Sequence, residues 1–309
     1  MKIAALHHRY ISMNVTFKQL RTFLALAEQE SITAASRALH VTQPTVSMQL
    51  KEITDSVGMP LYEVTGKKLQ LTEAGRDLEA TARAMLHEWD LFEQGIAAKR
   101  GLTAGRLRLA VVSTAKYFTP RLLGDFCRMH PEVEISLEVL NRDGVVQRLR
   151  ENVDDLYIMS KPPADIDAVA HAFLANPLVL IAPLAHPMAL TKNIALEDLQ
   201  AERFVLREKG SGTRLNTDAH FASHHFIPRI RLEMGSNEAL KQAVAGGLGL
   251  SVVSRHALGP DIAGQGLAVL EVKGFPIVSN WYTVHLQGKR PSPLAEAFMG
   301  YLERFAAAG

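Results

Sequence analysis

The segment SITAASRALHVTQPTVSMQLKEI, residues 31–53, constrains the fold of this chain most, because it places two short helix patterns around one tight turn. The turn signal falls at His40–Thr42, where Thr42 can cap the following helix and Pro44 fits its first turn. We predict a helix over residues 43–57. Its apolar positions recur every three or four residues and form one buried stripe of Val46, Leu50, Ile53 and Val57.

The opposite face of this helix is small or polar and has no bulky aromatic residue; it carries Pro44, Ser47, Met48, Lys51 and Asp55. Upstream, Ser31 or Thr33 can cap a short helix that runs to Leu39 and allows close packing through Ala34, Ala35 and Ala38. An earlier helix has its own buried stripe of Phe17, Leu20, Phe23, Leu24 and Ala27. Three such helices predict a helix-turn-helix, whose third helix lies in the DNA major groove. The alternative is an alanine-rich helix pair without a DNA-binding role.

The residues that follow favour DNA binding over this alternative. The segment LYEVTGKKLQLTEAG, residues 61–75, has two strand-like parts around a Thr65–Gly66 turn with two lysines. It predicts a basic hairpin, or wing, that can reach phosphates or the minor groove. Residues 1–72 carry eight Lys or Arg and five Asp or Glu, and this net charge of +3 also favours DNA binding.

Thr72 can cap a long helix over residues 73–99, which contains no proline. Apolar residues recur along it as in a heptad pattern: Leu78, Ala82, Met85, Trp89, Phe92 and Ile96. Packing on its own domain is one explanation of this stripe. We favour pairing with a second chain through Leu78, Met85, Trp89, Phe92 and Ile96, because two paired copies can bind a two-fold operator. Gly101 and Gly105 then predict a flexible hinge over residues 99–105.

Strand-like and helical segments alternate from Arg106 onward. The apolar segments RLRLAVV, VEISLEV, DDLYIMS, LVLIAP, FVLR and LSVVS predict strands of a parallel sheet. Ligands bind at the carboxyl ends of such strands, where polar residues follow several of them. We therefore predict one ligand site from Ser113, Thr114, Asn141, Arg142, Ser160, Lys161, Arg207, Gly210, Ser211, Gly212, Thr213, Arg214, Ser236 and Asn237. Helix N-termini, a glycine-rich loop and arginines favour an anion.

Length and composition set the remaining bounds. A chain of 309 residues predicts two or three domains, and 47% hydrophobic with 21% charged residues is ordinary for a globular protein. Cys127 is the single cysteine, which excludes an intramolecular disulfide and fits a reducing compartment. No apolar segment reaches membrane-spanning length, and the N-terminus lacks a signal-peptide core, so we expect a cytoplasmic protein without membrane contact.

Residues 15–75 resemble the winged helix-turn-helix of LysR-type transcriptional regulators through QLRTFLALAEQESITAASRALHVTQPTVSMQLKEI and LYEVTGKKLQLTEAG, and the similarity continues to the C-terminus. Val64 departs from the family pattern, where an arginine is usual. The resemblance implies an α/β multidomain protein: a winged helix-turn-helix, a long linker helix, and a two-subdomain effector domain like periplasmic binding proteins. The implied bounds are 1–14 for an N-terminal extension, 15–72 for the DNA-binding domain, 73–105 for the linker helix and hinge, and 106–309 for the effector domain. The extension is either a misassigned translation start before Met13 or an N-terminal arm. Its first subdomain would span about 106–168 and 272–309, and its second about 169–271, with crossovers near 165–170 and 270–283.

The predicted DNA-binding residues lie on the third helix and the wing: Thr42, Gln43, Pro44, Thr45, Ser47, Met48, Lys51, Thr65, Lys67 and Lys68. The effector half is similar to regulators of Calvin-cycle genes through DDLYIMSKPP, REKGSGTR, GSNEALKQAVAGGLGLSVVS and WYTVHLQGKRPSPLAEAF, although Ser160 and Lys161 replace the usual Gly and Arg or Gln. This similarity implies a phosphorylated sugar, a small organic acid or a nucleotide cofactor as effector. The target genes and the direction of regulation stay open.

We interpret the chain as a ligand-responsive DNA-binding regulator and not an enzyme. Gly210–Ser211–Gly212 lacks the spacing of a nucleophile elbow. His220 and His224 share a helix face without acidic or cysteine partners, so we expect no metal and no cofactor. The expected partners are double-stranded DNA with two-fold symmetry, a small anionic metabolite, further copies of the chain as a dimer and homotetramer, and RNA polymerase. The alternative function is a solute-binding or catalytic α/β protein with an incidental helical N-terminus.

Overall fold

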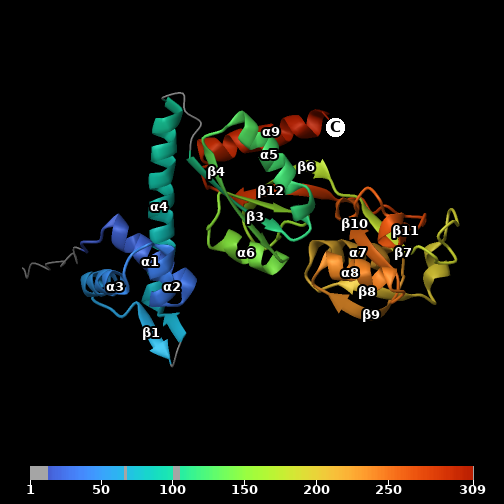
Figure 1. The fold of residues 1–309 in the computed structure, drawn as a ribbon, viewed down its shortest axis with the longest axis horizontal. Coiled ribbons are helices and arrows are strands. Elements are labelled where there is room, and N and C mark those ends of the chain that lie inside the picture. Colours follow the sequence, from blue (N-terminus) through green and yellow to red (C-terminus); the bar gives the residue numbers. More distant parts are fainter. Residues whose placement is uncertain (1–12, 66–67, 100–104, 309) are drawn as a thin grey trace, which may run out of the picture. The chain divides into compact units, whose positions relative to one another are not determined.

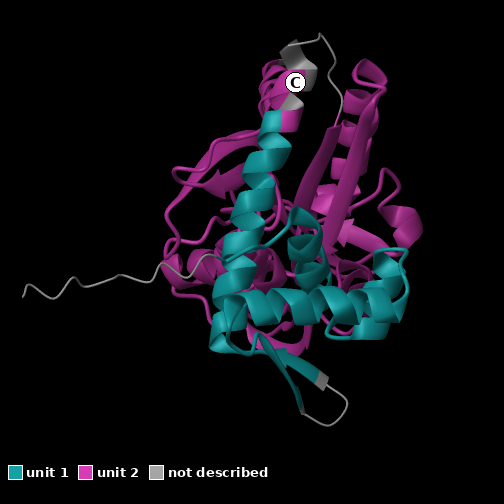
Figure 2. Cartoon of the chain, turned by 90° about the vertical axis from the view of Figure 1, so that its left-hand side faces the viewer, with its two compact units in different colours: residues 1–92 teal, residues 93–309 magenta. Residues whose placement is uncertain are grey.

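The computed structural model describes residues 13–65, 68–99 and 105–308. Residues 1–12 of the predicted extension, the wing tip at 66–67 and most of the predicted hinge, residues 100–104, lie outside this range. The chain divides into two compact units, residues 1–92 and 93–309, which Figure 2 distinguishes by colour. Each unit is described by itself below.

The first unit begins with three helices that end where local signals predict. Helix α1 (Phe17–Gln29) starts at a capping box formed by Thr16 and Gln19. Helix α2 (Ile32–Ala38) is capped by Ser31, and α3 (Gln43–Val57) is capped by Thr42 and ends at Gly58 in the left-handed region. The predicted helix-turn-helix is confirmed, and its second helix has the predicted bounds, residues 43–57 (Figure 1).

The core of this unit is formed by the predicted stripes with one correction. Leu20, Phe23, Val46, Leu50 and Ile53 are all buried together. Phe17, predicted to be buried with them, is 39% exposed, because it lies in the first turn of α1 and faces Trp89 rather than the core. The strands β1 (Tyr62–Thr65) and β2 (Lys68–Leu71) then pair antiparallel as the predicted hairpin.

Helix α4 (Glu73–Lys99) follows, and its apolar stripe divides between two roles. Leu78 and Ala82 pack into the core of the first unit together with Leu86, which the heptad pattern did not include. Met85, Trp89 and Phe92 are exposed. Packing on its own domain, the alternative explanation of the stripe, therefore holds for its beginning only.

Within its described residues, the second unit contains a five-stranded, a three-stranded and a two-stranded sheet. The first sheet has the strand order β4-β3-β5-β12-β6, with β3 (Gly105–Val112), β4 (Val133–Leu140), β5 (Leu156–Met159), β6 (Ala168–Ala175) and β12 (Asn280–Leu286). Only β4, β3 and β5 are parallel, and β12 runs antiparallel to β5 and β6. The prediction of a wholly parallel sheet is therefore wrong, because the chain returns from the second subdomain in the opposite direction. Figure 1 shows α5 (Thr119–Met129) and α9 (Pro293–Ala308) on one face of this sheet and α6 (Arg142–Arg150) on the other.

The three-stranded and the two-stranded sheet belong to the other subdomain. Strand β7 (Leu178–Pro183) pairs antiparallel with β10 (Ser251–Ser254) and β11 (Leu267–Val269). Strands β8 (Arg203–Arg207) and β9 (Arg229–Met234) are parallel, and a bridge between Phe204 and Leu250 joins them to the rest. Helices α7 (Gly212–Ser223) and α8 (Asn237–Ala245) belong to this subdomain. The chain enters it after β6, at Asn176, and returns near Ser279, where the Asn176 amide donates to the Ser279 carbonyl at 2.8 Å.

Candidate functional site

Helix α3 presents the exposed face that the sequence predicts. Val46, Leu50 and Ile53 have no exposed surface, whereas Ser47, Met48 and Lys51 are exposed on the other side of the helix. Gln43, Pro44 and Thr42 at the start of the helix are also exposed, and Thr45 is half-buried. The exposed face is therefore rigidly held by its buried opposite face and is short-chained, as a helix that enters a groove requires.

A buried hydrogen bond fixes α3 against α1. The Thr22 hydroxyl donates to the Gln49 side-chain carbonyl, and both residues are buried. On the surface the Gln19 amide donates to Glu52 at 2.9 Å, again between α1 and α3. Neither contact follows from helical periodicity, because each joins residues about thirty positions apart.

The β1–β2 hairpin places Thr65 opposite Lys68 at its outer end. Lys67, the other predicted wing lysine, lies outside the described residues. Val64 is 65% exposed on β1, so the position at which the family usually has an arginine faces solvent and offers no charge. The predicted hairpin is present. It lacks one positive charge of the family pattern, because Val64 stands where an arginine is usual.

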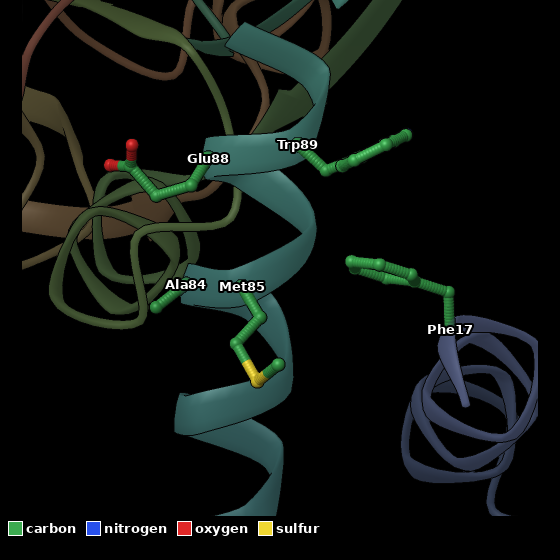
Figure 3. A pocket seen from close by; sticks show the side chains of 5 residues that line it. All are labelled: Phe17, Ala84, Met85, Glu88 and Trp89. Atoms are coloured by element: carbon green, nitrogen blue, oxygen red, sulfur yellow. The ribbon is translucent and has the colours of Figure 1, made fainter. Parts of the chain in front are cut away.

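An apolar ridge runs along the exposed side of α4. Trp89 lies between Phe17 and Phe92, with ring centroids 5.3 and 5.5 Å away, and all three rings have exposed surface. Figure 3 shows Phe17 on α1 facing Trp89 on α4, beside a hollow lined by Phe17, Ala84, Met85, Glu88 and Trp89. Exposed apolar patches of this kind mark interaction surfaces. Ile96, also predicted to pair, is half-buried within the second unit.

The two subdomains of the second unit meet at Arg207, the last residue of β8. Its side chain is only 3% exposed. Its Nη1 donates to Asn237 Oδ1 at 2.8 Å and to Thr114 Oγ1 at 3.2 Å, and its Nη2 donates to Ser113 Oγ at 3.3 Å. Ser113 and Thr114 follow β3 of the first subdomain, so a single guanidinium connects both subdomains.

The local structure around Thr114 differs from the prediction, which placed Ser113 and Thr114 at the start of a helix. The segment after β3 is a short 3-10 turn, Ala115–Tyr117, and α5 begins only at Thr119. Thr114 therefore caps no helix; its hydroxyl accepts from Arg207 and from the Asn237 amide at 3.0 Å. The expected helix N-terminus at Ser113–Thr114 is corrected to a turn whose hydroxyls face the second subdomain.

The loop before α7 closes against the first subdomain. Gly210 has φ of +88°, a conformation that favours glycine, and Ser211 caps α7 by accepting from the Arg214 backbone N–H at 3.1 Å. A Cβ on Gly212 would lie 2.5 Å from Ser160 Oγ, so only glycine allows this approach. The backbone conformation favours glycine at position 210, whereas at position 212 glycine makes room for the Ser160 side chain.

Arg214 and Arg207 have different environments. Arg214 Nε donates to Asp218 at 2.8 Å, and its Nη1 donates to Glu233 and to the Arg207 carbonyl, each at 2.9 Å. Its charge is thus paired within the second subdomain, where it supports the end of β8. Thr213 is buried next to it, and its carbonyl accepts from the Thr217 hydroxyl.

The remaining predicted residues flank this meeting point. Asn141 caps α6 by accepting from the Gly144 N–H at 2.9 Å, and Arg142 Nε donates to the Lys161 carbonyl at 3.3 Å. Ser236 caps α8, whose first residue is Asn237. The predicted effector residues from both subdomains therefore lie on connected segments of one region.

Sequence reasoning missed a second link across the subdomains. Glu238 on α8 accepts from Lys116 Nζ at 3.0 Å and from the Tyr117 hydroxyl. Burial disfavours the Glu238 carboxylate, but the hydrogen bonds from Tyr117 and Lys116 outweigh it and lower the pKa of Glu238 to about 2. Burial and the bond to Glu238 raise the pKa of Tyr117. No sequence signal indicates this link, because its partners are more than 120 residues apart.

No three His, Cys, Asp or Glu side chains are grouped as a metal site within residues 13–65, 68–99 and 105–308. The His220 and His224 rings lie 4.3 Å apart, and burial together with the charge of His224 lowers the pKa of His220. Among the helices that the structure describes, none is long and apolar enough to span a membrane.

A helix-turn-helix with a basic hairpin, together with a two-subdomain α/β domain whose polar residues meet between its sheets, defines the class of ligand-responsive transcription regulators. Residues 17–76 match the model of bacterial regulatory helix-turn-helix proteins of the lysR family, and residues 100–307 match the LysR substrate binding domain. The chain belongs to the LysR family of transcriptional regulators.

Comparison with individual proteins shows which LysR-type regulators this chain is similar to. The RuBisCO operon transcriptional regulator of Acidithiobacillus ferrooxidans is 45% identical over 296 residues, which is 96% of each chain. The solved regulatory domain of CcmR from Synechocystis PCC6803, in complex with 2-PG, is 49% identical with a TM-score of 0.63, covering 65% of this chain and 97% of that one. A full-length OxyR variant from Pseudomonas aeruginosa is 22% identical with a TM-score of 0.73, covering 96% of this chain and 95% of that one, and shares the fold. The similarity to regulators of Calvin-cycle genes is confirmed.

Proposed function

We propose that this LysR-type regulator binds operator DNA through α3 and the wing, and that a small anionic metabolite linked to carbon fixation binds between the subdomains of its effector domain and changes that DNA binding. The chain acts by binding and not by catalysis. The observation that supports the effector site most is Arg207, a buried cation that joins Ser113 and Thr114 of one subdomain to Asn237 of the other.

An anion suits this site for electrostatic reasons. A buried guanidinium with hydroxyl and amide neighbours forms charge-assisted hydrogen bonds, which are stronger than those between neutral groups. The Gly210–Gly212 loop and the start of α7 add backbone N–H groups nearby. The CcmR regulatory domain, 49% identical, was solved with 2-PG, which makes 2-PG the first probe for this chain.

The same residues provide a route for regulation. Because Arg207 and Asn237 contact Thr114 across the subdomains, a ligand bound there changes the free energy of one subdomain arrangement relative to another. A tenfold change in DNA affinity needs a coupling free energy of only about 1.4 kcal/mol. One charge-assisted hydrogen bond has this magnitude.

The DNA-binding residues we propose are Thr42, Gln43, Pro44, Thr45, Ser47, Met48 and Lys51 on and before α3, with Thr65, Lys67 and Lys68 in the wing. The exposure of Ser47, Met48 and Lys51, opposite a fully buried stripe, supports this assignment. We further propose that the ridge on α4 pairs two chains, that pairs assemble into a tetramer, and that the bound regulator contacts RNA polymerase in the cytoplasm, where its DNA target lies.

A gel shift with the DNA upstream of the chain's own gene, with and without 2-PG, tests the function. We expect sequence-dependent binding that 2-PG changes at least threefold. Thr114→Val should remove this response while basal DNA affinity stays within twofold, since Thr114 lies in the effector domain. Thr114→Ser, which keeps the hydroxyl, is the matched control. Absence of sequence-dependent binding would instead favour a solute-binding or catalytic α/β protein.

A further inference from the structure

The donors of Arg207 are all occupied within the protein. Its side chain donates to Asn237, Thr114 and Ser113, as described above. In addition, Nη2 donates to the Gly235 carbonyl oxygen at 3.4 Å. The remaining two bonds go to the next residue in the chain: Nε donates to Glu208 Oε2 at 2.7 Å, and Nη2 donates to Glu208 Oε1 at 2.8 Å. The guanidinium is therefore not open to an incoming anion unless one of these partners leaves.

Glu208 differs from the other partners in charge and in exposure. Among the described residues it is the only carboxylate that contacts Arg207, and it holds the guanidinium through two parallel bonds, the geometry in which arginine binds carboxylates and phosphates. Its side chain is 29% exposed, whereas that of Arg207 is 3% exposed. The Glu208 side chain therefore lies between solvent and the Nε–Nη2 edge of Arg207.

The main chain holds Glu208 in place while its side chain can turn. The Glu208 N–H donates to the Met234 carbonyl at 3.1 Å, and the Glu208 carbonyl accepts from the Ser211 N–H at 3.2 Å. Loss of the carboxylate from Arg207 therefore requires only a rotation of one side chain. It does not require β8 or the loop before α7 to move.

We propose that Glu208 is a built-in competitor of the effector: its carboxylate occupies the edge of Arg207 that the anion takes, and the anion displaces it. This inference rests on the proposed function, because it assumes an anionic effector in this region. A buried guanidinium without a counter-ion is strongly destabilising, and Glu208 prevents that state when no ligand is bound. The exchange also selects for anions that bind a guanidinium more strongly than the tethered carboxylate does.

Calorimetric titration of the full chain with 2-PG tests the proposal, with inorganic phosphate as a second probe. Glu208→Gln and Glu208→Ala both remove the competing charge, so each should bind 2-PG at least tenfold more tightly than the wild type. Phosphate affinity should rise in the same direction. Glu271→Gln removes an exposed carboxylate of the second subdomain outside the site and should change 2-PG affinity less than twofold.

The outcomes separate this inference from the proposed function. A wild type that binds 2-PG, with variants that bind it equally or more weakly, shows that Glu208 merely positions Arg207 and overturns the inference alone. If neither the wild type nor the folded variants bind 2-PG or phosphate, the proposed effector site fails as well. If Glu208→Gln does not fold, Glu208→Ala gives the same comparison, and circular dichroism identifies which variants are folded.

Discussion

Single buried polar contacts determine how precisely each domain presents its surface. In the DNA-binding unit, the bond from Thr22 to Gln49 joins α1 to the buried side of α3, in addition to the apolar packing between these helices. This bond and the buried stripe of Val46, Leu50 and Ile53 together hold the helix whose other side exposes Ser47, Met48 and Lys51. In the effector domain, Arg207 has the corresponding role between the subdomains.

Thr22→Val should lower the free energy of unfolding by about 1–3 kcal/mol, because the Gln49 amide is then buried without its partner. Urea unfolding followed by circular dichroism measures this change. Thr22→Ser keeps the hydroxyl and should lose less than half as much. Equal losses in the two variants would assign the effect to the methyl group and not to the hydrogen bond.

Lys51→Ala should weaken operator binding, and the slope of log K against log salt should become shallower by about one, as expected for one lost phosphate contact. Lys51 is exposed, so folding should be unaffected. Fluorescence anisotropy with labelled operator DNA between 50 and 300 mM salt, roughly the range in which such slopes are measured, gives the value. Lys51→Arg should retain the slope. An unchanged slope in Lys51→Ala would place this side chain away from the DNA backbone.

Helix α4 shows how one element serves two purposes. Its 27 residues begin by packing Leu78, Ala82 and Leu86 into the DNA-binding core and continue with the exposed Met85, Trp89 and Phe92. Both sets belong to one side of the helix, but the core of the first unit covers only Leu78, Ala82 and Leu86 and leaves Met85, Trp89 and Phe92 exposed. We propose that a second copy of the chain covers the second set, because a symmetric pair buries the same surface on both copies.

Trp89→Asp should shift the protein to smaller oligomers in analytical ultracentrifugation, because a charge in an apolar interface costs at least a few kcal/mol. Ala80→Asp places the same charge on an exposed position of α4, half a turn away from Trp89 around the helix, and should leave assembly intact. If Trp89→Asp assembles like the wild type, the ridge on α4 is not the pairing surface.

For the whole effector domain, the arrangement of the subdomains depends on contacts between distant parts of the chain. Arg207 and Glu238 each reach the segment after β3, Arg207 through Ser113 and Thr114 and Glu238 through Lys116 and Tyr117. The depressed pKa of Glu238 means that folding favours its charged form. Its contribution is therefore complete above a pH of about 4.5 and is lost as the pH falls toward 2.

Glu238→Gln should lower stability at pH 7 by no more than about 1 kcal/mol, because the Glu238 side chain is 49% exposed and water screens the pair. The difference from the wild type should shrink between pH 4.5 and pH 2. Thermal unfolding of both proteins across this pH range measures it, with Glu271→Gln as a control that shows no such trend. A difference that does not depend on pH would mean that the Glu238 charge does not contribute.

Local signals predicted most elements because their causes lie within a few residues. The predicted caps Ser31, Thr42 and Thr72 each accept a hydrogen bond from an amide three residues further along the chain. Ser211, Ser236 and Asn141, which were predicted only as site residues, cap helices in the same way. Strands β6, β9, β11 and β12 were missed. Strand β6 is alanine-rich and largely exposed, so it lacks the apolar pattern of a core strand.

The sequence alone therefore determined the helix-turn-helix, the wing, the long helix and which segments supply the candidate effector site, because capping and periodicity act over one or two turns. The tertiary structure decided which arginine lies between the subdomains, that Glu208 contacts this arginine, and that Glu238 forms a second link across the subdomains. It also decided that Phe17 belongs to the α4 ridge. Arg207 and Arg214 lie on the same short segment, and only the packing of β8 against Thr114 and Asn237 distinguishes them. Such contacts join residues about 90 to 120 positions apart, and no local pattern encodes a pairing that depends on how two sheets meet.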